Sequence, residues 1–296
     1  MSRILTVLRY PGGKSKYIKK YLEPYLFKNF NRFVDPFVGG GSYPLYILKE
    51  YPNREVWIND FNLNVYSFWK ALQNDYQKLY EEALSIKQNN NEETGFDLFS
   101  KFSKEINDLA KDDYYRRGLY FYVMNRTSFS GLTEKGYFTP RAWQISFTPS
   151  IISNLLKAGP LLKHTRITNL DYKDIFKEVV ESDYVFLDPP YDIKHFLYGK
   201  DGKFHKGFDH LKFKNQVDTL KGKFLITYNN NDTLCEYYKN YNIDFVDYKY
   251  SMALTKGSGS ANKETKELMI YNYELENVLN ESSLAETNFG VKNGRK

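Results

Sequence analysis

The α/β character of this 296-residue chain is indicated by one segment, Arg32-Phe33-Val34-Asp35-Pro36-Phe37-Val38-Gly39-Gly40-Gly41-Ser42. Its first residues, 32–36, are typical of a buried strand, and three glycines then precede a helix predicted over 43–50. Glycine lets the backbone turn sharply and approach a bound ligand closely. Because a helix is also predicted over 14–26 and a second strand over 55–59, helices and strands alternate as in a parallel α/β sheet.

The same alternation returns in the second half of the chain. Strands are predicted over 184–187, 224–227, 243–246 and 268–271. Residues 65–121 instead show helical spacing of apolar side chains without strand punctuation, and glycines and polar turn residues over 125–140 predict a hairpin or an irregular loop. We therefore expect an α/β protein with an inserted, mainly helical domain that carries a hairpin.

The composition bounds the class of protein and its partners. The 42 Lys and Arg exceed the 36 Asp and Glu, so the formal net charge of +6 favours polyanionic partners. Aromatic residues make up 18%, which suits a core and also surfaces that stack on bases. The single cysteine, Cys235, leaves no disulfide framework or thiolate zinc site, and no apolar run has the length of a membrane span. We expect a cytoplasmic protein with no metal and no membrane partner.

The strongest local motif is Asp188-Pro189-Pro190-Tyr191, directly after the apolar strand predicted over 184–187. One reaction that this turn suits is methylation of the amino group of adenine. That amino group is a poor nucleophile, because its lone pair is delocalised into the ring. A carboxylate at Asp188 and the carbonyl of Pro189 can accept its two hydrogens, and two prolines stiffen the turn. Tyr191 offers a flat face for a base. The alternative is a plain strand-ending turn.

The glycine loop differs from the dinucleotide fingerprint, because Pro44 stands where the third glycine would be. This departure argues against a cofactor that carries a pyrophosphate. Asp60, at the end of the strand predicted over 55–59, can hydrogen-bond ribose hydroxyls. Together the loop and the acid indicate an adenosine-bearing cofactor, whereas singly they are compatible with a flexible turn and a helix N-cap.

A third motif, Arg9-Tyr10-Pro11-Gly12-Gly13-Lys14-Ser15, contains Gly-Lys-Ser but is not a phosphate-binding loop, because Leu8 occupies the position that requires glycine. A nucleoside triphosphatase is therefore a weak alternative. Tyr10 and Lys14 can line a cofactor pocket by stacking and by meeting a carboxylate. Lys14 is equally compatible with the first turn of a basic helix.

These three motifs, in this order, resemble the Dam-type DNA adenine methyltransferase family, the D-P-P-Y class. The resemblance spans nearly the whole chain and includes residues 125–132 and 267–270. It implies a Rossmann-like methyltransferase sheet and S-adenosylmethionine as cofactor. Carried over by position, it places cofactor contacts at Tyr10, Lys14, Asp35, Phe37, Gly39, Gly41, Asp60 and Asp188, and the catalytic turn at Asp188, Pro189, Pro190 and Tyr191.

The resemblance also divides the chain into domains. A cofactor-binding catalytic domain is expected over 1–64 and 165–276, a target-recognition domain over 65–164 and a flexible tail over 277–296. Basic side chains alternate with aromatic ones in the recognition segment, and any one of them can be a phosphate anchor or an ion-pair partner instead of a base reader. The expected DNA contacts are Arg116, Arg117, Arg126, Ser130, Lys135 and Arg141.

Two loops are expected to be mobile: 192–210, which contains several Lys together with Gly and Asp turn residues, and 255–263, which is rich in Gly and Ser. The first contains His195, His205 and His210, but without the spacing of a metal site, so we interpret it as a cationic loop that closes on DNA or cofactor.

The implied function is site-specific methylation of adenine N6 in double-stranded DNA, by base flipping and direct in-line transfer. A cognate restriction endonuclease, acting separately on the same site, is a candidate partner. Cysteine-dependent methylation at carbon 5 of cytosine is excluded, because Cys235 has no Pro-Cys setting near the predicted site. Two alternatives stay open: a cytosine-N4 methyltransferase, and a catalytically silent DNA-binding protein on the same fold.

Overall fold

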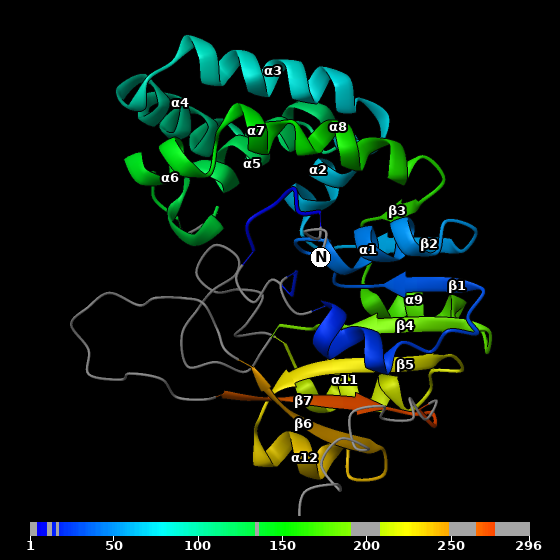
Figure 1. Cartoon of the computed structure of the whole chain (residues 1–296). Coiled ribbons are helices and arrows are strands. Elements are labelled where there is room, and N and C mark those ends of the chain that lie inside the picture. Colours follow the sequence, from blue (N-terminus) through cyan, green and yellow to red (C-terminus); the bar gives the residue numbers. More distant parts are fainter. Residues whose placement is uncertain are drawn as a thin grey trace, which may run out of the picture.

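A seven-stranded sheet forms the centre of the molecule in the computed structural model, which describes residues 5–10, 14–15, 18–133, 136–190, 208–248 and 265–275 (Figure 1). The strand order is β3-β2-β1-β4-β5-β7-β6; β7 runs antiparallel to both β5 and β6, and the other neighbouring strands are parallel. The strands are β1 (Arg32–Asp35), β2 (Glu55–Asn59), β3 (Arg166–Thr168), β4 (Asp183–Leu187), β5 (Lys223–Asn229), β6 (Asn242–Tyr248) and β7 (Thr265–Tyr271). The predicted Rossmann-like α/β class is confirmed.

Helices cover both faces of the sheet, as parallel strands require. On one face lies α1 (Ser42–Glu50), and on the other lie α9 (Tyr172–Glu178), α11 (His210–Val217) and α12 (Asp232–Tyr237). Successive strand residues alternate between the two cores, so Phe33 joins the α1 side and Val34 the α9 side.

A helical segment lies between β2 and β3 in the chain, and Figure 1 shows it gathered beside the β3 end of the sheet, away from β6. Its elements are α2 (Leu63–Asn74), α3 (Tyr76–Asn89), α4 (Glu92–Glu105), α5 (Tyr114–Thr127), η3 (Phe129–Gly131), α6 (Pro140–Ile145), α7 (Pro149–Ile152), α8 (Asn154–Ala158) and η4 (Gly159–Leu162). Helices α2 and α5 pack closely because α5 presents Gly118 to α2, where a Cβ would lie 2.7 Å from the Ser67 carbonyl oxygen.

The predicted hairpin is present as an antiparallel bridge between Ser128 and Phe138. The amide of Phe129 donates to the carbonyl of Tyr137 at 3.0 Å, and the amide of Thr139 donates to the carbonyl of Thr127 at 3.0 Å. We call this element the 128–138 hairpin; Glu134 and Lys135 lie outside the described residues.

Of the helix predicted over 14–26, the described residues 18–25 are helical, whereas Lys14, Ser15 and Leu26 are not. Residues 18–22 form a short π-helical turn, η1 (Ile18–Leu22), followed by a 3-10 turn, η2 (Glu23–Tyr25). Pro24 explains the break, because its ring removes a backbone donor and clashes with the preceding turn of an α-helix.

Candidate active site

The sheet has a topological switch point between β1 and β4. Strand β1 pairs with β2 on one side and with β4 on the other, so the connections leave in opposite directions from this pair. Open α/β sheets bind ligands in the crevice at the carboxyl ends of such strands. Asp35 ends β1, Asp60 follows β2 and Asp188 follows β4, so three carboxylates stand along this edge.

The glycine loop after β1 has a backbone shape that side chains would disturb. Gly39 and Gly41 have φ angles of +43° and +62°, in the region that favours glycine. A Cβ on Gly41 would lie 2.1 Å from the ring of Trp69, whose indole nitrogen donates to the Gly39 carbonyl at 3.1 Å. A Cβ on Gly39 would lie 2.8 Å from the ring of Tyr10. The structure therefore brings the predicted Tyr10, Gly39 and Gly41 together.

The Asp60 carboxylate fixes this loop from β2. One oxygen accepts from the Gly39 amide at 3.0 Å and the other accepts from the Asn62 amide at 2.8 Å. The N-cap of α2 is Asn62, so the interpretation of Asp60 as a helix N-cap is wrong. Asp60 instead links the glycine loop to the start of α2.

Asp35 is buried beside the same loop, and its carboxylate accepts from the Phe37 amide at 3.0 Å. Burial raises the pKa of Asp35 well above its usual range, and the negative charges of Asp188 and Asp60 raise it further, although the Phe37 hydrogen bond opposes the shift. Phe37 packs against the rings of Tyr172 and Phe213, at centroid distances of 5.7 and 5.8 Å. The turn at 35–37 therefore combines a buried carboxylate, Asp35, with an aromatic ring, Phe37, that packs against two other rings.

Asp188 is held by a cation and a hydroxyl. The Lys14 ammonium lies 3.1 and 3.3 Å from the two carboxylate oxygens, and the Thr227 hydroxyl on β5 donates to Oδ1 at 2.7 Å. Lys14 also lies 3.7 Å from the carboxylate of Glu267 on β7. The exposed fractions of the side chains are 4% for Lys14, 0% for Glu267 and 27% for Asp188. Of the two acids that contact Lys14, Asp188 is therefore the one that solvent or a ligand reaches.

Lys14 stays charged in this setting. Burial lowers its pKa, but the carboxylates of Asp188 and Glu267 more than offset that effect and leave the pKa above its ordinary value. The Lys14 ammonium therefore faces two carboxylates, the buried Glu267 and the partly exposed Asp188. The predicted cofactor residues Lys14 and Asp188, far apart in sequence, are in direct contact.

Of the predicted catalytic turn, the structure describes Asp188, Pro189 and Pro190, and Tyr191 lies outside the described residues. Pro189 is buried and Pro190 half-buried. The turn directly follows β4, as predicted, at the edge that carries the glycine loop.

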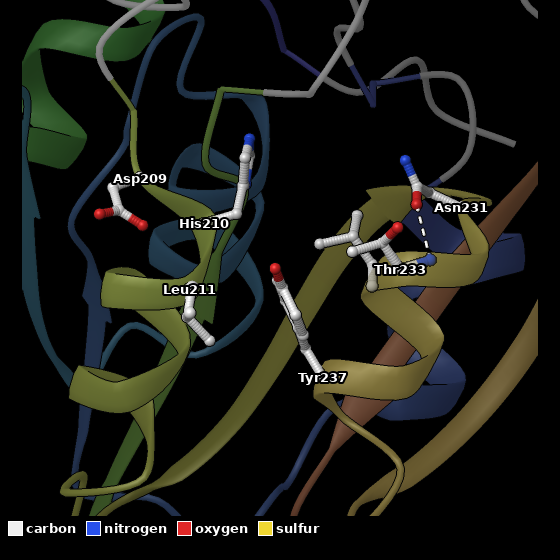
Figure 2. Close-up of a pocket in the computed structure, with 7 residues that line it drawn as sticks. Asp209, His210, Leu211, Asn231, Thr233 and Tyr237 are labelled. Atoms are coloured by element: carbon white, nitrogen blue, oxygen red, sulfur yellow. Dashed lines mark hydrogen bonds between the residues drawn. The ribbon is translucent and has the colours of Figure 1, made fainter.

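A hollow lies on the α11 and α12 side of the sheet, with a volume of ≈ 230 Å³. Figure 2 shows its lining between these two helices, where Asp209 caps α11, Asn231 caps α12 and Tyr237 ends α12. His210 lies against Tyr228, with 3.1 Å between Nδ1 and the tyrosine hydroxyl. The prediction that His210 belongs to a cationic loop is wrong, because it begins α11; His195, His205 and the loop at 255–263 lie outside the described residues.

The predicted DNA contact at Arg117 is wrong. This side chain is 5% exposed, and its guanidinium donates to the carbonyls of Ile106 and Leu109 at 2.7 Å each and to Asn64 Oδ1 at 3.1 Å. These bonds satisfy the carbonyl of Ile106, the C-cap of α4, and that of Leu109 in the turn that follows, so Arg117 is a structural residue.

Arg126 is likewise 6% exposed and donates to the Ser146 carbonyl at 2.8 Å, which corrects its prediction as a surface contact. Arg116 is exposed but forms an ion pair with Asp113, the N-cap of α5. Arg141 is exposed at the start of α6, Ser130 is half-buried in the hairpin, and Lys135 lies outside the described residues.

Three further residues hold the site together. Thr227 and Glu267 contact the Lys14–Asp188 pair, as described above. Asn59 uses all of its amide: Oδ1 accepts from Thr168 and from the Leu170 amide at 2.8 Å each, and Nδ2 donates to the Pro36 and Leu170 carbonyls at 3.0 Å each. A polar residue inside an apolar strand was the available signal for each.

Within the described part of the chain, no helix has both the length and the apolar composition of a membrane span. Nor do the described His, Cys, Asp and Glu side chains include a group of three or more placed to hold a metal ion.

Comparison with known proteins identifies the family. Type II methyltransferase M.MjaIII of Methanocaldococcus jannaschii is 30% identical over 200 residues, covering 62% of this chain and 68% of that protein. Type II methyltransferase M.CviBI of Paramecium bursaria Chlorella virus NC1A is 27% identical over 269 residues, covering 90% of this chain and 99% of that protein. The resemblance read from the motifs is confirmed. Since residues 10–252 match the family model, the chain belongs to the D12 class N6 adenine-specific DNA methyltransferases.

Proposed function

We propose that this protein transfers a methyl group from S-adenosylmethionine to the N6 amino group of adenine in double-stranded DNA. The family acts on adenine N6 in DNA, which supports the reaction and the methyl donor. The observation that carries the proposal to individual residues is the Asp188 carboxylate, which is fixed by Lys14 and Thr227 at the switch point of the sheet.

The residues at this edge fit S-adenosylmethionine. Asp60 follows β2, where an acid can accept from ribose hydroxyls, and the glycine loop is too narrow for a Cβ beside Tyr10. Asp188, which is 27% exposed, supplies an anion for the ammonium of the methionine moiety, and the buried Lys14 holds that carboxylate in place. When bound, the cofactor supplies an electrophilic methyl group on a sulfonium centre.

The chain's own contribution is to ready the adenine amine. Asp188 accepts one amino hydrogen and the Pro189 carbonyl accepts the other, which turns the nitrogen lone pair out of the ring and toward the methyl donor. Thr227 and Lys14 fix the orientation of the carboxylate. As the nitrogen–methyl bond forms, the methyl–sulfur bond breaks and its electron pair stays on the leaving thioether sulfur, while the amine releases one proton and keeps one hydrogen. Asp188 is placed to receive that proton or pass it to solvent.

The amino group of a paired adenine points into the duplex, so the target base has to leave the stack to reach Asp188. We propose base flipping on this ground. A 2-aminopurine at the target position should brighten when the protein binds, and an unchanged fluorescence would contradict extrusion.

We further propose that the segment 65–164 recognises DNA and that 1–64 with 165–276 forms the catalytic domain. Support comes from the 128–138 hairpin, where the Phe129 and Tyr137 rings stack at 5.6 Å and 7° while remaining 42% and 62% exposed. Exposed aromatic rings cost free energy in water and suit contact with bases. Arg141, exposed nearby along the chain, is suited to a phosphate.

A cognate restriction endonuclease acting separately on the same sequence is proposed as the biological counterpart, with the cytoplasm as the place of action. Two relatives carry the name type II methyltransferase, which supports this proposal. DNA modified by this protein should resist a nuclease from the same cells that cuts unmodified DNA; equal cutting of both would contradict the pairing.

The reaction itself is tested by incubating the protein with isotopically labelled S-adenosylmethionine and unmethylated duplex DNA, followed by nucleoside digestion and mass spectrometry. Labelled N6-methyladenine is expected from the wild type and from Asp174→Ala, a control in an exposed ion pair on α9. Asp188→Ala should bind DNA but give no product. Recovery of N4-methylcytosine, or product from Asp188→Ala at the wild-type rate, would reject the proposal.

A further inference from the structure

A buried asparagine joins two segments that are far apart in the sequence. Asn125, near the end of α5, is fully buried, and its side-chain oxygen accepts from the Arg9 amide at 2.8 Å. Its Nδ2 donates to the Arg9 carbonyl at 2.8 Å and to the Gly131 carbonyl at 3.0 Å. The side chain therefore pairs with both polar groups of the Arg9 backbone, as a neighbouring strand would, while it also holds the 128–138 hairpin.

Two further contacts bring the Arg9 segment close to the 128–138 hairpin, and we call this contact region the junction. The Arg9 guanidinium donates to the Ser128 carbonyl at 2.8 Å, at the base of the hairpin. Gly131 has a φ of +77°, and a Cβ there would lie 2.3 Å from the Arg9 carbonyl oxygen. Glycine at 131 thus allows the hairpin backbone to approach the N-terminal segment closely.

The N-terminal segment leads directly to the active site. Tyr10, the residue after Arg9, lies against Gly39 and Gly40 of the glycine loop, and Lys14 contacts Asp188. A continuous set of contacts therefore runs from the hairpin through Asn125 and Arg9 to the residues that surround the proposed methyl donor. Fixed geometry between DNA and donor matters because small misplacements of reacting groups lower rates strongly.

We propose that Asn125 is a positioning residue, which registers DNA bound at the 128–138 hairpin with the catalytic carboxylate through the Arg9 backbone. The inference rests on the proposed function. It predicts that Asn125 determines the rate of methyl transfer in the ternary complex and has little effect on the separate binding of DNA or S-adenosylmethionine.

The test uses Asn125→Asp in the full-length protein. The new carboxylate still accepts from the Arg9 amide, but its second oxygen faces the Arg9 and Gly131 carbonyls, so two hydrogen bonds become repulsive contacts. The matched control is Asn272→Asp. Asn272 also bridges backbone groups, accepting from the Phe224 amide at 2.9 Å and donating to the Gly222 carbonyl at 3.1 Å, but it lies beyond β7, away from the hairpin.

Single-turnover methyl transfer is measured on unmethylated bacteriophage DNA with both ligands saturating, together with the two separate dissociation constants. For Asn125→Asp we expect the rate per active site to fall at least tenfold and each dissociation constant to change less than threefold, whereas Asn272→Asp keeps the wild-type rate. Gly131→Ala, which crowds the same junction from the hairpin side, should share the rate loss and serves if Asn125→Asp does not fold.

A rate within twofold of wild type in the folded variant overturns the inference. So does a rate loss that higher ligand concentrations restore, because it would place Asn125 in a binding role. A wild type that methylates no DNA would instead overturn the proposed function, and the inference with it.

Discussion

Replacing Lys14 with methionine tests the buried charge arrangement at the centre of the site. Lys14 is buried with its ammonium 3.1 Å from Asp188 and 3.7 Å from Glu267, and Glu267 has no exposed surface. Methionine keeps much of the aliphatic volume but removes the cation. Removing one partner of a buried pair leaves an uncompensated charge and costs about 3–5 kcal/mol. We expect Lys14→Met to lose that much unfolding free energy at pH 8.

The pH dependence follows from the sign of the charges. In the wild type the pKa of Lys14 is raised by folding, so the charged Lys14 stabilises the folded state. This stabilisation is fully present below the ordinary lysine pKa of about 10.4, and it is lost as the pH rises through the higher pKa of the folded state. In Lys14→Met the buried Glu267 carboxylate loses its contact with the Lys14 ammonium, and its protonation removes a buried charge. The stability deficit of the variant should therefore shrink as the pH falls from 8 towards 5.

Urea unfolding followed by tryptophan fluorescence gives these free energies, because Trp57, Trp69 and Trp143 are all buried. Lys14→Met/Glu267→Gln removes both charges and should recover more than half of the loss. Lys101→Met, in an exposed pair with Glu105, should leave the unfolding free energy nearly unchanged. A loss below about 1 kcal/mol for Lys14→Met, or a double variant no more stable than it, would refute the reasoning.

Other positions make independent predictions. Gly41→Ala places a Cβ 2.1 Å from the Trp69 ring and should lower the unfolding free energy by about 1–3 kcal/mol in the same urea assay; an unchanged midpoint would contradict the close approach. Asp35→Asn should be more stable than wild type at pH 8, because burial raises the pKa of Asp35 and its ionised form therefore destabilises the folded state. The difference in unfolding free energy between the two proteins should shrink as the pH falls towards about 4, and a variant less stable at every pH would disprove this. Arg117→Met should lose about 1.5–3 kcal/mol because carbonyls at Ile106 and Leu109 lose their donor, and wild-type thermal and urea stability would be incompatible with that role. Arg141→Ala should keep the wild-type stability but bind DNA more weakly, and the slope of log binding constant against log salt concentration should fall in magnitude by about one. An unaltered slope would show that Arg141 does not contact a DNA phosphate.

The local pattern was sufficient for the elements that flank the site. Strand β2 matches its predicted range of 55–59, because its apolar run is bounded by polar residues on both sides. Strand β3 was missed, since Arg166-Ile167-Thr168 offers one apolar residue among three. A strand this short depends on pairing with β2, which no local pattern records.

Contacts across the sequence explain what the motifs could not supply. The motifs predicted Lys14 and Asp188 separately, but their pairing, and the roles of Thr227 and Glu267, arise only when β4, β5 and β7 come together. Arg117 has the charge of a DNA contact, yet its partners are backbone carbonyls, which are identical for every residue type and therefore invisible in a sequence.

The central claim is that the carboxylate after β4 readies the adenine amine for methylation. It is tested most directly by methylome sequencing of DNA from a methylation-deficient host that expresses either the wild type or Asp188→Ala. We predict N6-methyladenine within a defined sequence context for the wild type and unmodified adenine for the variant. Cytosine as the modified base, or the same adenine methylation from Asp188→Ala, would contradict the account.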